Sequence, residues 1–265
     1  MRAKNIYTWE DRKAGQVMAG RDSLWDALGL SWREHMVISF TGGGGKTSAM
    51  FSLADELADR GKHVIVTTST HIFFPQNRRV VPADRAETVK KFIKDHAEWF
   101  SSGTGRVLVT GCPGPEGKLK GMPLSEMEKL AGCGDILLVE ADGAKRLPIK
   151  IPREGEPVLL KNTHAVIGCA GLDSIGRPWE EKCFRWELAE KVFGWQTEKK
   201  LITPAQVAQL LVSGQGTRKG AESMEYRILL NKADDESRLS DAAKVLESME
   251  AEWKRRCVVT SFFTI

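Results

Sequence analysis

Four consecutive glycines, followed by Lys46 and Thr47, constrain the fold of this chain more than any other feature. The run lies between an apolar segment at 36–40, predicted as a strand, and a helical pattern at about 47–60. Glycine lets backbone N–H groups approach an anion without Cβ clashes, and a helix N-terminus adds a partial positive charge. The segment therefore predicts a phosphate-binding loop between a strand and a helix.

The spacing fits the short pattern GxxGK[ST] that starts at Gly42, because Phe40 occupies the first glycine position of the longer pattern GxxxxGK[ST]. We expect Lys46 to reach the β- and γ-phosphates of a nucleotide and the Thr47 hydroxyl to coordinate Mg²⁺. The predicted ligand-binding residues of the loop are Gly42, Gly43, Gly44, Gly45, Lys46, Thr47 and Ser48. A glycine-rich turn with an accidental Lys-Thr pair is the alternative.

Two carboxylates follow the apolar run at 135–140, which has the continuous pattern of a central parallel strand. In phosphate-loop proteins a carboxylate at such a strand end contacts Mg²⁺ directly or through water. Either Glu140 or Asp142 could do so, or one could hold the metal while the other orients a nucleophile. Lys145 and Arg146 come next and could neutralise phosphate charge.

The tetrapeptide Asn231-Lys232-Ala233-Asp234 follows an apolar segment at 226–230. NKxD at a strand end is typical of guanine recognition: Asp234 would accept from the base, the Lys232 stem would pack on it, and Asn231 would tether neighbouring loops. Thr260-Ser261 could supply the next base-side loop. The motif indicates GTP, but ATP stays open, and a surface turn is the alternative.

Hydroxyl groups and a histidine end the predicted strand at 63–68, in the run Thr67-Thr68-Ser69-Thr70-His71. Ligands of doubly wound sheets bind at the carboxyl ends of strands, so Thr70 and His71 are candidate second-substrate or catalytic contacts. Arg185 could reach a γ-phosphate, although a surface salt bridge explains it equally well. The candidate catalytic residues are Lys46, His71, Asp142, Lys145 and Arg185.

Predicted strands and helices alternate along almost the whole chain, which indicates an α/β fold with a mostly parallel, doubly wound sheet and helices on both faces. We expect one phosphate-loop NTPase-like domain over residues 1–265, with an insertion or helical lobe near 145–225. The further predicted strands are 106–110, 164–168, 226–230 and 257–260, the last closing the sheet. The further predicted helices are 23–28, 85–100, 124–130, one opening at Thr203-Pro204, and 239–253. Residues 111–123 are expected to form a loop or small hairpin, and residues 1–35 are otherwise weakly patterned.

Composition limits the class of protein. The 265 residues are 42% hydrophobic and 28% charged, which is typical of a globular protein. The net charge of +4 is too small to indicate nucleic-acid binding, and no apolar run is long enough to span a membrane. Five scattered cysteines without a CxxC pair, and an N-terminus without an apolar signal stretch, favour a reduced, cytoplasmic protein. The oligomeric state is left undefined.

Six stretches in this order resemble the YqeC family, whose members are accessory proteins of selenium-dependent molybdenum hydroxylases. They are ISFTGGGGKTS, VIVTTSTHIF, LLVEADGAKRLPIKIP, EPVL, AVIGCAGLDSIGRP and LLNKAD. The most specific is the ADG sequence followed by Leu147, Pro148 and Lys150. Where the family tends to have His-Arg-Pro-Glu, this chain has Phe184-Arg185-Trp186-Glu187, so only Arg185 and Glu187 correspond.

The resemblance implies a nucleotide-dependent role in maturing a molybdenum hydroxylase or its cofactor. The expected cofactors are Mg²⁺ and ATP or GTP, and the expected reaction is hydrolysis or transfer of the γ-phosphoryl group. Two alternatives stay open. One is a non-catalytic, nucleotide-dependent switch or chaperone, and the other is an ATP-dependent ligase or kinase that acts on a small substrate.

Overall fold

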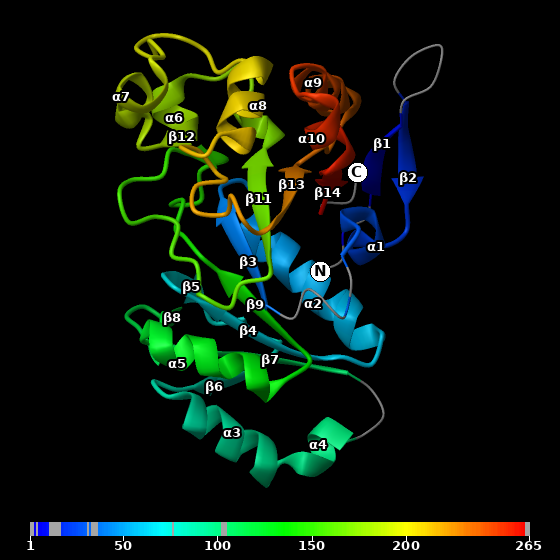
Figure 1. Ribbon diagram of the computed structural model, residues 1–265, viewed down its shortest axis with the longest axis vertical. Helices are drawn as coiled ribbons and strands as arrows, with labels where there is room; N and C mark the ends of the chain where they lie inside the picture. Colours follow the sequence, from blue (N-terminus) through cyan, green and yellow to red (C-terminus); the bar gives the residue numbers. More distant parts are fainter. Residues whose placement is uncertain are drawn as a thin grey trace.

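The computed structural model describes the whole chain except residues 1, 2, 4, 11–16, 31, 33–36, 76, 102–104 and 263–265. Within the described residues, one mixed sheet of 12 strands runs through the molecule (Figure 1). In spatial order its strands are β2 (Val17–Arg21), β1 (Asn5–Glu10), β14 (Cys257–Ser261), β13 (Glu225–Asn231), β11 (Ala165–Gly171), β3 (Val37–Gly42), β9 (Ile136–Glu140), β4 (His63–Thr68), β7 (Arg106–Pro113), β8 (Lys118–Lys120) and β5 (His71–Phe73), with β6 (Arg79–Pro82) paired to β7. All pairs from β14 to β7 are parallel, whereas β1, β2, β5 and β8 pair antiparallel.

Helices cover both faces of the sheet, as predicted. The helices are α1 (Leu24–Leu28), α2 (Lys46–Asp59), α3 (Ala86–Asp95), α4 (Ala97–Ser101), α5 (Leu124–Lys129), α6 (Trp179–Lys182), α7 (Ala189–Phe193), α8 (Pro204–Val212), α9 (Glu236–Glu247) and α10 (Ala251–Arg255). Successive strand residues point to opposite faces. On β3, Ile38 therefore belongs to the apolar cluster that includes α2, whereas its neighbour Val37 belongs to the cluster that includes α3 and α5. On β11, Val166 joins a third cluster with α8 and α9.

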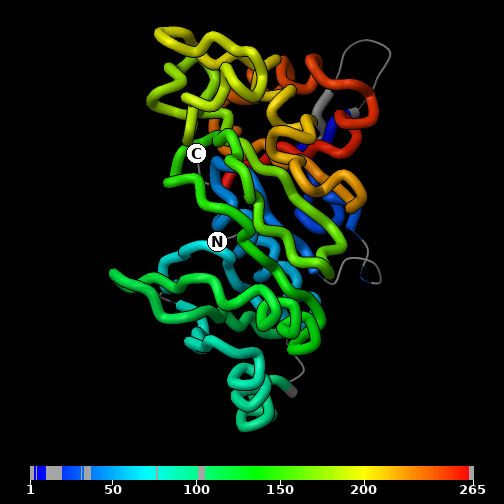
Figure 2. Tube along the Cα trace, turned by 60° about the vertical axis from the view of Figure 1, so that its left-hand side comes forward, coloured from blue at the N-terminus to red at the C-terminus, as the bar shows by residue number. Residues whose placement is uncertain are grey.

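The chain between residues 145 and 225 has two parts. It contributes β11 to the middle of the main sheet, and it also forms a lobe with α6, α7 and α8. A second, parallel sheet joins β10 (Ile149–Lys150) to β12 (Cys183–Phe184) at the base of this lobe. Figure 2 shows the yellow lobe at one end of the molecule and the teal helices α3 and α4 at the other. The short helical turns η1 (Leu130–Cys133), η2 (Leu172–Ser174) and η3 (Trp186–Leu188) complete the elements.

Several sequence-based boundaries are confirmed. The short helix near 23–28 is α1, capped by the Ser23 hydroxyl, and the helix at Thr203-Pro204 is α8, which has a complete capping box. Residues 111–123 form a hairpin between β7 and β8. The predicted strand at 36–40 is β3, although its first residue, 36, lies outside the described residues.

Other boundaries are wrong. The predicted strand at 257–260 does not close the sheet, because β1 pairs with β14 and β2 pairs with β1. This hairpin lies in the weakly patterned N-terminal segment and has no continuous apolar run to mark it. The predicted helices 85–100 and 239–253 each form two helices, broken at His96 and at 248–250.

In the part of the chain that the structure describes, no helix combines the length and the apolar character needed to cross a bilayer. The five cysteines are free thiols, and four of them are buried.

Candidate functional site

The four glycines form a tight loop between β3 and α2, and they are required by close packing. Gly42 and Gly44 have φ angles of 88° and 63°, which disfavour other residues. A Cβ on Gly42 would lie 2.3 Å from the Cys169 carbonyl oxygen, and one on Gly44 would lie 2.0 Å from the Gly171 nitrogen. The loop is thus pressed against the carboxyl end of β11, which leaves no room for side chains.

The N–H groups of the first three glycines donate to acceptors within the protein. Gly42 N donates to Asp142 Oδ2 at 3.2 Å, Gly43 N to the Cys169 carbonyl at 3.0 Å, and Gly44 N to the Leu147 carbonyl at 3.1 Å. The first turn of α2 differs, because helix geometry leaves its N–H groups without partners in the helix. In this arrangement an anion would meet the start of α2 rather than the first three glycine N–H groups.

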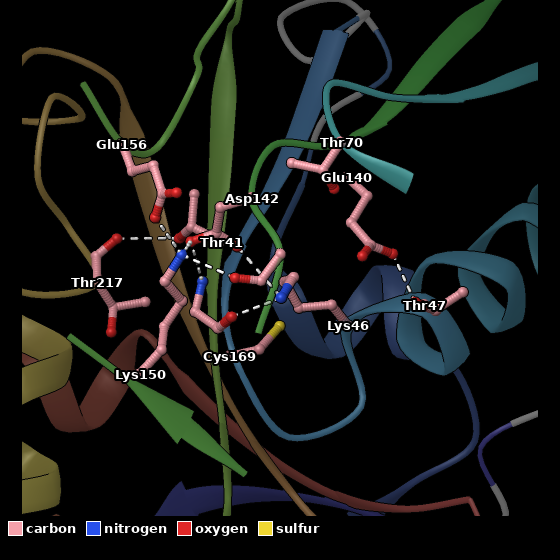
Figure 3. A network of polar contacts seen from close by, with 12 residues as sticks. Thr41, Lys46, Thr47, Thr70, Glu140, Asp142, Lys150, Glu156, Cys169 and Thr217 are labelled. Carbon is pink, nitrogen blue, oxygen red and sulfur yellow. Dashed lines mark hydrogen bonds and ion pairs between the residues drawn. The ribbon is translucent and has the colours of Figure 1, made fainter. Parts of the chain in front are cut away.

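Lys46 lies folded back across the loop. Its Nζ donates to the Gly42 carbonyl at 2.5 Å and lies 3.2 Å from Asp142 Oδ1 (Figure 3). The side chain is only 4% exposed. Burial by itself would lower the pKa of Lys46, but the nearby Asp142 and Glu140 carboxylates outweigh burial and raise the pKa above its ordinary value. The ammonium therefore stays charged and already faces the loop.

The two sequence-predicted carboxylates have different surroundings. The Thr47 hydroxyl donates to Glu140 Oε2 at 2.5 Å, so a hydroxyl and a carboxylate oxygen meet at the start of α2. Burial raises the pKa of Glu140, although Lys46 and Thr47 partly oppose the rise. Asp142, by contrast, has both oxygens against cations, since Oδ1 faces Lys46 and Oδ2 faces Lys150.

A chain of buried charges, which the sequence analysis missed, runs from the loop to the lobe. Lys150 is 1% exposed, and its Nζ lies 3.1 Å from Asp142 Oδ2 and 2.6 Å from Glu156 Oε2. Arg185 binds the same Glu156 with two hydrogen bonds of 2.5 and 2.9 Å. Figure 3 shows Asp142 between the two lysine nitrogens. Lys150 belongs to the most specific stretch of the family resemblance, and its place within the apolar run Leu147–Pro152 is a second signal that could have indicated a buried charge.

Glu156 is strongly affected by this environment. Its burial would raise the pKa, but hydrogen bonds from Arg185 and Lys150 outweigh burial and hold the pKa at about 2. The carboxylate is therefore ionised at every pH at which the protein is expected to work, and it fixes the orientation of Arg185.

The NKAD tetrapeptide lies beside the phosphate loop. Asn231 is buried, and it joins the Gly44 carbonyl (2.8 Å) to the Thr260 hydroxyl (2.6 Å). The Asp234 carboxylate accepts from the Ser261 hydroxyl at 2.5 Å, and Lys232 lies 2.7 Å from Asp173 Oδ2. The tetrapeptide thus connects the loop to the ends of β11 and β14.

The hydroxyl cluster after β4 is mostly structural. The Thr67 hydroxyl donates to the Thr110 carbonyl, and those of Thr68 and Ser69 donate to the Glu140 carbonyl. Thr70 N donates to the Thr68 hydroxyl at 3.0 Å, whereas His71 is exposed on β5 and pairs in register with Lys120. The candidate catalytic residues therefore fall into two groups. Lys46, Asp142 and Arg185 belong to the network of ion pairs, whereas His71 and Lys145 are exposed.

A cleft of about 560 Å³ opens beside the first turn of α2, which is a size typical of small-ligand sites. Its lining includes Thr47, Ser48 and Phe51, and it is bounded on the other side by Arg78, whose guanidinium lies 4.6 Å from the Phe51 ring. Thr47 and Ser48, at the start of α2, are thus accessible from an open cleft.

Comparison with known proteins identifies the family. The model described as YqeC protein matches residues 38–187, which is more than half of the chain. The chain belongs to the YqeC family. A relative described as "Uncharacterized protein YqeC", from Escherichia coli (strain K12), is 31% identical over 182 residues, or 66% of this chain and 64% of the relative. The match therefore spans less than two thirds of that relative's length. No solved structure matches the chain.

In this YqeC family member, the matched residues 38–187 include the loop, Glu140, the charge chain and Arg185, whereas NKAD lies beyond them. The site fits a magnesium ion, because Mg²⁺ prefers one or two carboxylates together with hydroxyl, water and phosphate oxygens. Thr47 and Glu140 would hold it. Among the described residues, no cluster of three or more His, Cys, Asp or Glu side chains offers an all-protein metal site.

Proposed function

We propose that this protein binds a Mg²⁺–nucleoside triphosphate at residues 42–48 and hydrolyses or transfers its γ-phosphoryl group. The observation that carries the proposal is the charged Lys46 ammonium. Lys46 is the first residue of the 14-residue helix α2, and its side chain folds back over the glycine loop. A buried lysine with a carboxylate partner can exchange that partner for a phosphate group. The resulting phosphate-loop NTPase would gain most of its catalysis from positioning and charge neutralisation.

The residues of the buried network have separate roles in this proposal. Thr47 and Glu140 would hold Mg²⁺, whose chemistry is to neutralise charge on the β- and γ-phosphate oxygens. Asp142 would keep the loop in place, because its two oxygens contact Lys46, Lys150 and the Gly42 N–H group. When Lys46 turns to a phosphate, Lys150 would still balance the Asp142 charge.

The base would lie near Asn231 and Asp234, since Asn231 contacts Gly44 directly. A carboxylate at Asp234 would accept hydrogen bonds from guanine, which favours GTP, while ATP remains the alternative. The family resemblance extends the proposal to maturation of a selenium-dependent molybdenum hydroxylase or its cofactor. A nucleotide-dependent switch would use the same loop without fast turnover, and a ligase or kinase would use it to activate a small substrate.

Calorimetric titration of Mg²⁺–ATP and Mg²⁺–GTP tests the proposal. Wild type is expected to bind at least one of them, and Lys46→Ala is expected to lose binding by tenfold or more, because charge-assisted bonds to phosphate are among the strongest in proteins. Lys90→Ala, on the exposed face of α3, is the matched control. Equal affinity and turnover in wild type and Lys46→Ala would refute the phosphate-loop assignment.

The same titration identifies the nucleotide. GTP binding that is lost in Asp234→Ala but kept in Glu236→Ala, an exposed neighbour, would establish a guanine site. ATP binding that is indifferent to Asp234→Ala would instead assign NKAD a structural role.

A further inference from the structure

Three basic residues, two on the turn after Asp142 and one directly after β12, adopt backbone conformations that normally favour glycine. Lys145, Arg146 and Arg185 have φ angles of 48°, 64° and 63°. Each such residue costs of order 1 kcal/mol, and such residues cluster at functional sites. The fold therefore holds these cations in place against the preference of the backbone.

Two of these cations gather around one aromatic ring. The Arg185 guanidinium lies 4.3 Å and the Lys145 ammonium 5.0 Å from the centre of the Phe184 ring. The ring is held by β12, whose Phe184 pairs in register with Lys150 of β10, and the Lys150 ammonium lies 5.8 Å from the same ring. The Arg146 guanidinium lies against a different ring, 4.7 Å from the centre of the Phe73 ring, and Phe73 is 51% exposed.

The charges at this place are not balanced. Lys150 and Arg185 are paired with Asp142 and Glu156, which also contact Lys46 and Arg153. Lys145 and Arg146 are exposed, and no ion pair of the described residues includes either of them. A positive excess of two charges therefore faces solvent next to the phosphate loop.

The turn that carries Lys145 is attached to the loop itself. The Leu147 carbonyl accepts from Gly44 N, and Leu147 N donates to the Ala144 carbonyl, closing the turn. A group bound by Lys145 would therefore lie on the turn that is hydrogen-bonded to the glycine loop.

We propose that Lys145, Arg146 and Arg185 form a second anion site, which binds a phosphate or carboxylate group of a small second substrate. Arg185 has N–H donors beyond the two that bind Glu156, and Lys145 has all three donors available for an oxyanion. The inference rests on the proposed function for its substrate role, but the anion site itself can be tested separately.

Inorganic pyrophosphate, titrated calorimetrically in the presence of EDTA, is the probe. Lys46→Met removes the loop lysine, so the remaining binding reports the second site. Adding Lys145→Met is expected to weaken this binding about tenfold or more, because one charge-assisted hydrogen bond is lost. Adding Lys145→Arg should preserve binding, and adding Lys90→Met on α3 should leave it unchanged. Absence of pyrophosphate binding in Lys46→Met, or equal binding after Lys145→Met, would overturn the proposal.

The wild-type chain supplies an independent measurement if Lys46→Met does not fold. Wild type is expected to bind two pyrophosphates and Lys145→Met, an exposed substitution, only one. One pyrophosphate in both proteins would mean that the loop is the sole anion site and would overturn the inference. Two pyrophosphates in wild type and one in Lys145→Met, together with no binding of Mg²⁺–ATP or Mg²⁺–GTP by wild type, would instead refute the proposed function while the second anion site stands.

Discussion

Gly44 illustrates how single residues determine the geometry of the site. Its φ is positive, its N–H and carbonyl groups bind Leu147 and Asn231, and its Cα faces Gly171 at close range. The glycine run was visible in the sequence, but the close packing that requires glycine at these positions was not. The sequence indicated glycines that approach a ligand, whereas the structure has glycines that also approach the neighbouring strand.

Gly44→Ala is expected to lower the free energy of unfolding by about 2 kcal/mol or more, because the methyl group would collide with backbone atoms and occupy a left-handed conformation. Gly132→Ala is the matched control, since a Cβ there would meet nothing within 4 Å. Urea denaturation of both variants measures the difference. Equal stability of the two variants would contradict the packing described for the loop.

Glu156 gives the molecule a pH-dependent contribution to stability. Its folded pKa of about 2 lies below the ordinary value of 4.5. The stabilisation is therefore complete above the ordinary value and disappears as the pH falls toward about 2. The difference in unfolding free energy between wild type and Glu156→Gln should be largest near neutral pH and shrink on acidification. Urea titrations at several pH values measure it, with the exposed Glu154→Gln as a control whose effect stays small throughout.

At the scale of elements, the site lies where the carboxyl ends of four parallel strands meet. β3 supplies the loop, β9 leads into Glu140 and Asp142, β11 supplies the surface under the glycines, and β13 leads into Asn231. Their apolar runs made these strands predictable. The ion pair between Lys150 and Glu156 was not predictable, although both residues lie in the stretches that resemble the family, because their spacing follows no periodic pattern. The N-terminal hairpin was not predictable either, because it lacks the apolar run that marked the inner strands.

The connection between β13, β14 and the loop can be measured as a coupling. Asn231→Ala removes its bond to the Gly44 carbonyl and leaves the Thr260 hydroxyl without its acceptor, while Thr260→Val removes that hydroxyl. In a double-mutant cycle we expect a coupling energy of about 0.5–1.5 kcal/mol in the free energy of unfolding. Strictly additive effects would show that Asn231 does not connect the two elements.

For the whole molecule, a mostly parallel sheet covered on both faces carries three apolar clusters. One of them runs along one face of the sheet from β14 to β7, and the other two divide the opposite face between them. The general α/β architecture followed from the alternation of strands and helices. The position of the lobe did not, because its apolar packing on β11 and β13 and its ion pairs through Lys150, Glu156 and Arg185 join segments that have no periodic relation in the sequence.

A ligand that binds only the folded protein stabilises the whole molecule. If Mg²⁺–nucleotide binds as proposed, a concentration of about 100 times its dissociation constant should add about 2.7 kcal/mol to the free energy of unfolding. Thermal unfolding should therefore shift upward in wild type and in Lys90→Ala but not in Lys46→Ala. An equal shift in all three proteins would place the nucleotide away from the loop.

The left-handed conformations of Lys145, Arg146 and Arg185 have a consequence for protein engineering. Glycine would relieve the backbone at each position, so Lys145→Gly is expected to be no less stable than wild type while it loses a binding charge. Selection of this protein for thermal stability alone would therefore favour glycine in this turn and remove charges of the proposed anion site. Positions at which a substitution raises the stability of the fold but weakens ligand binding are typical of a functional surface.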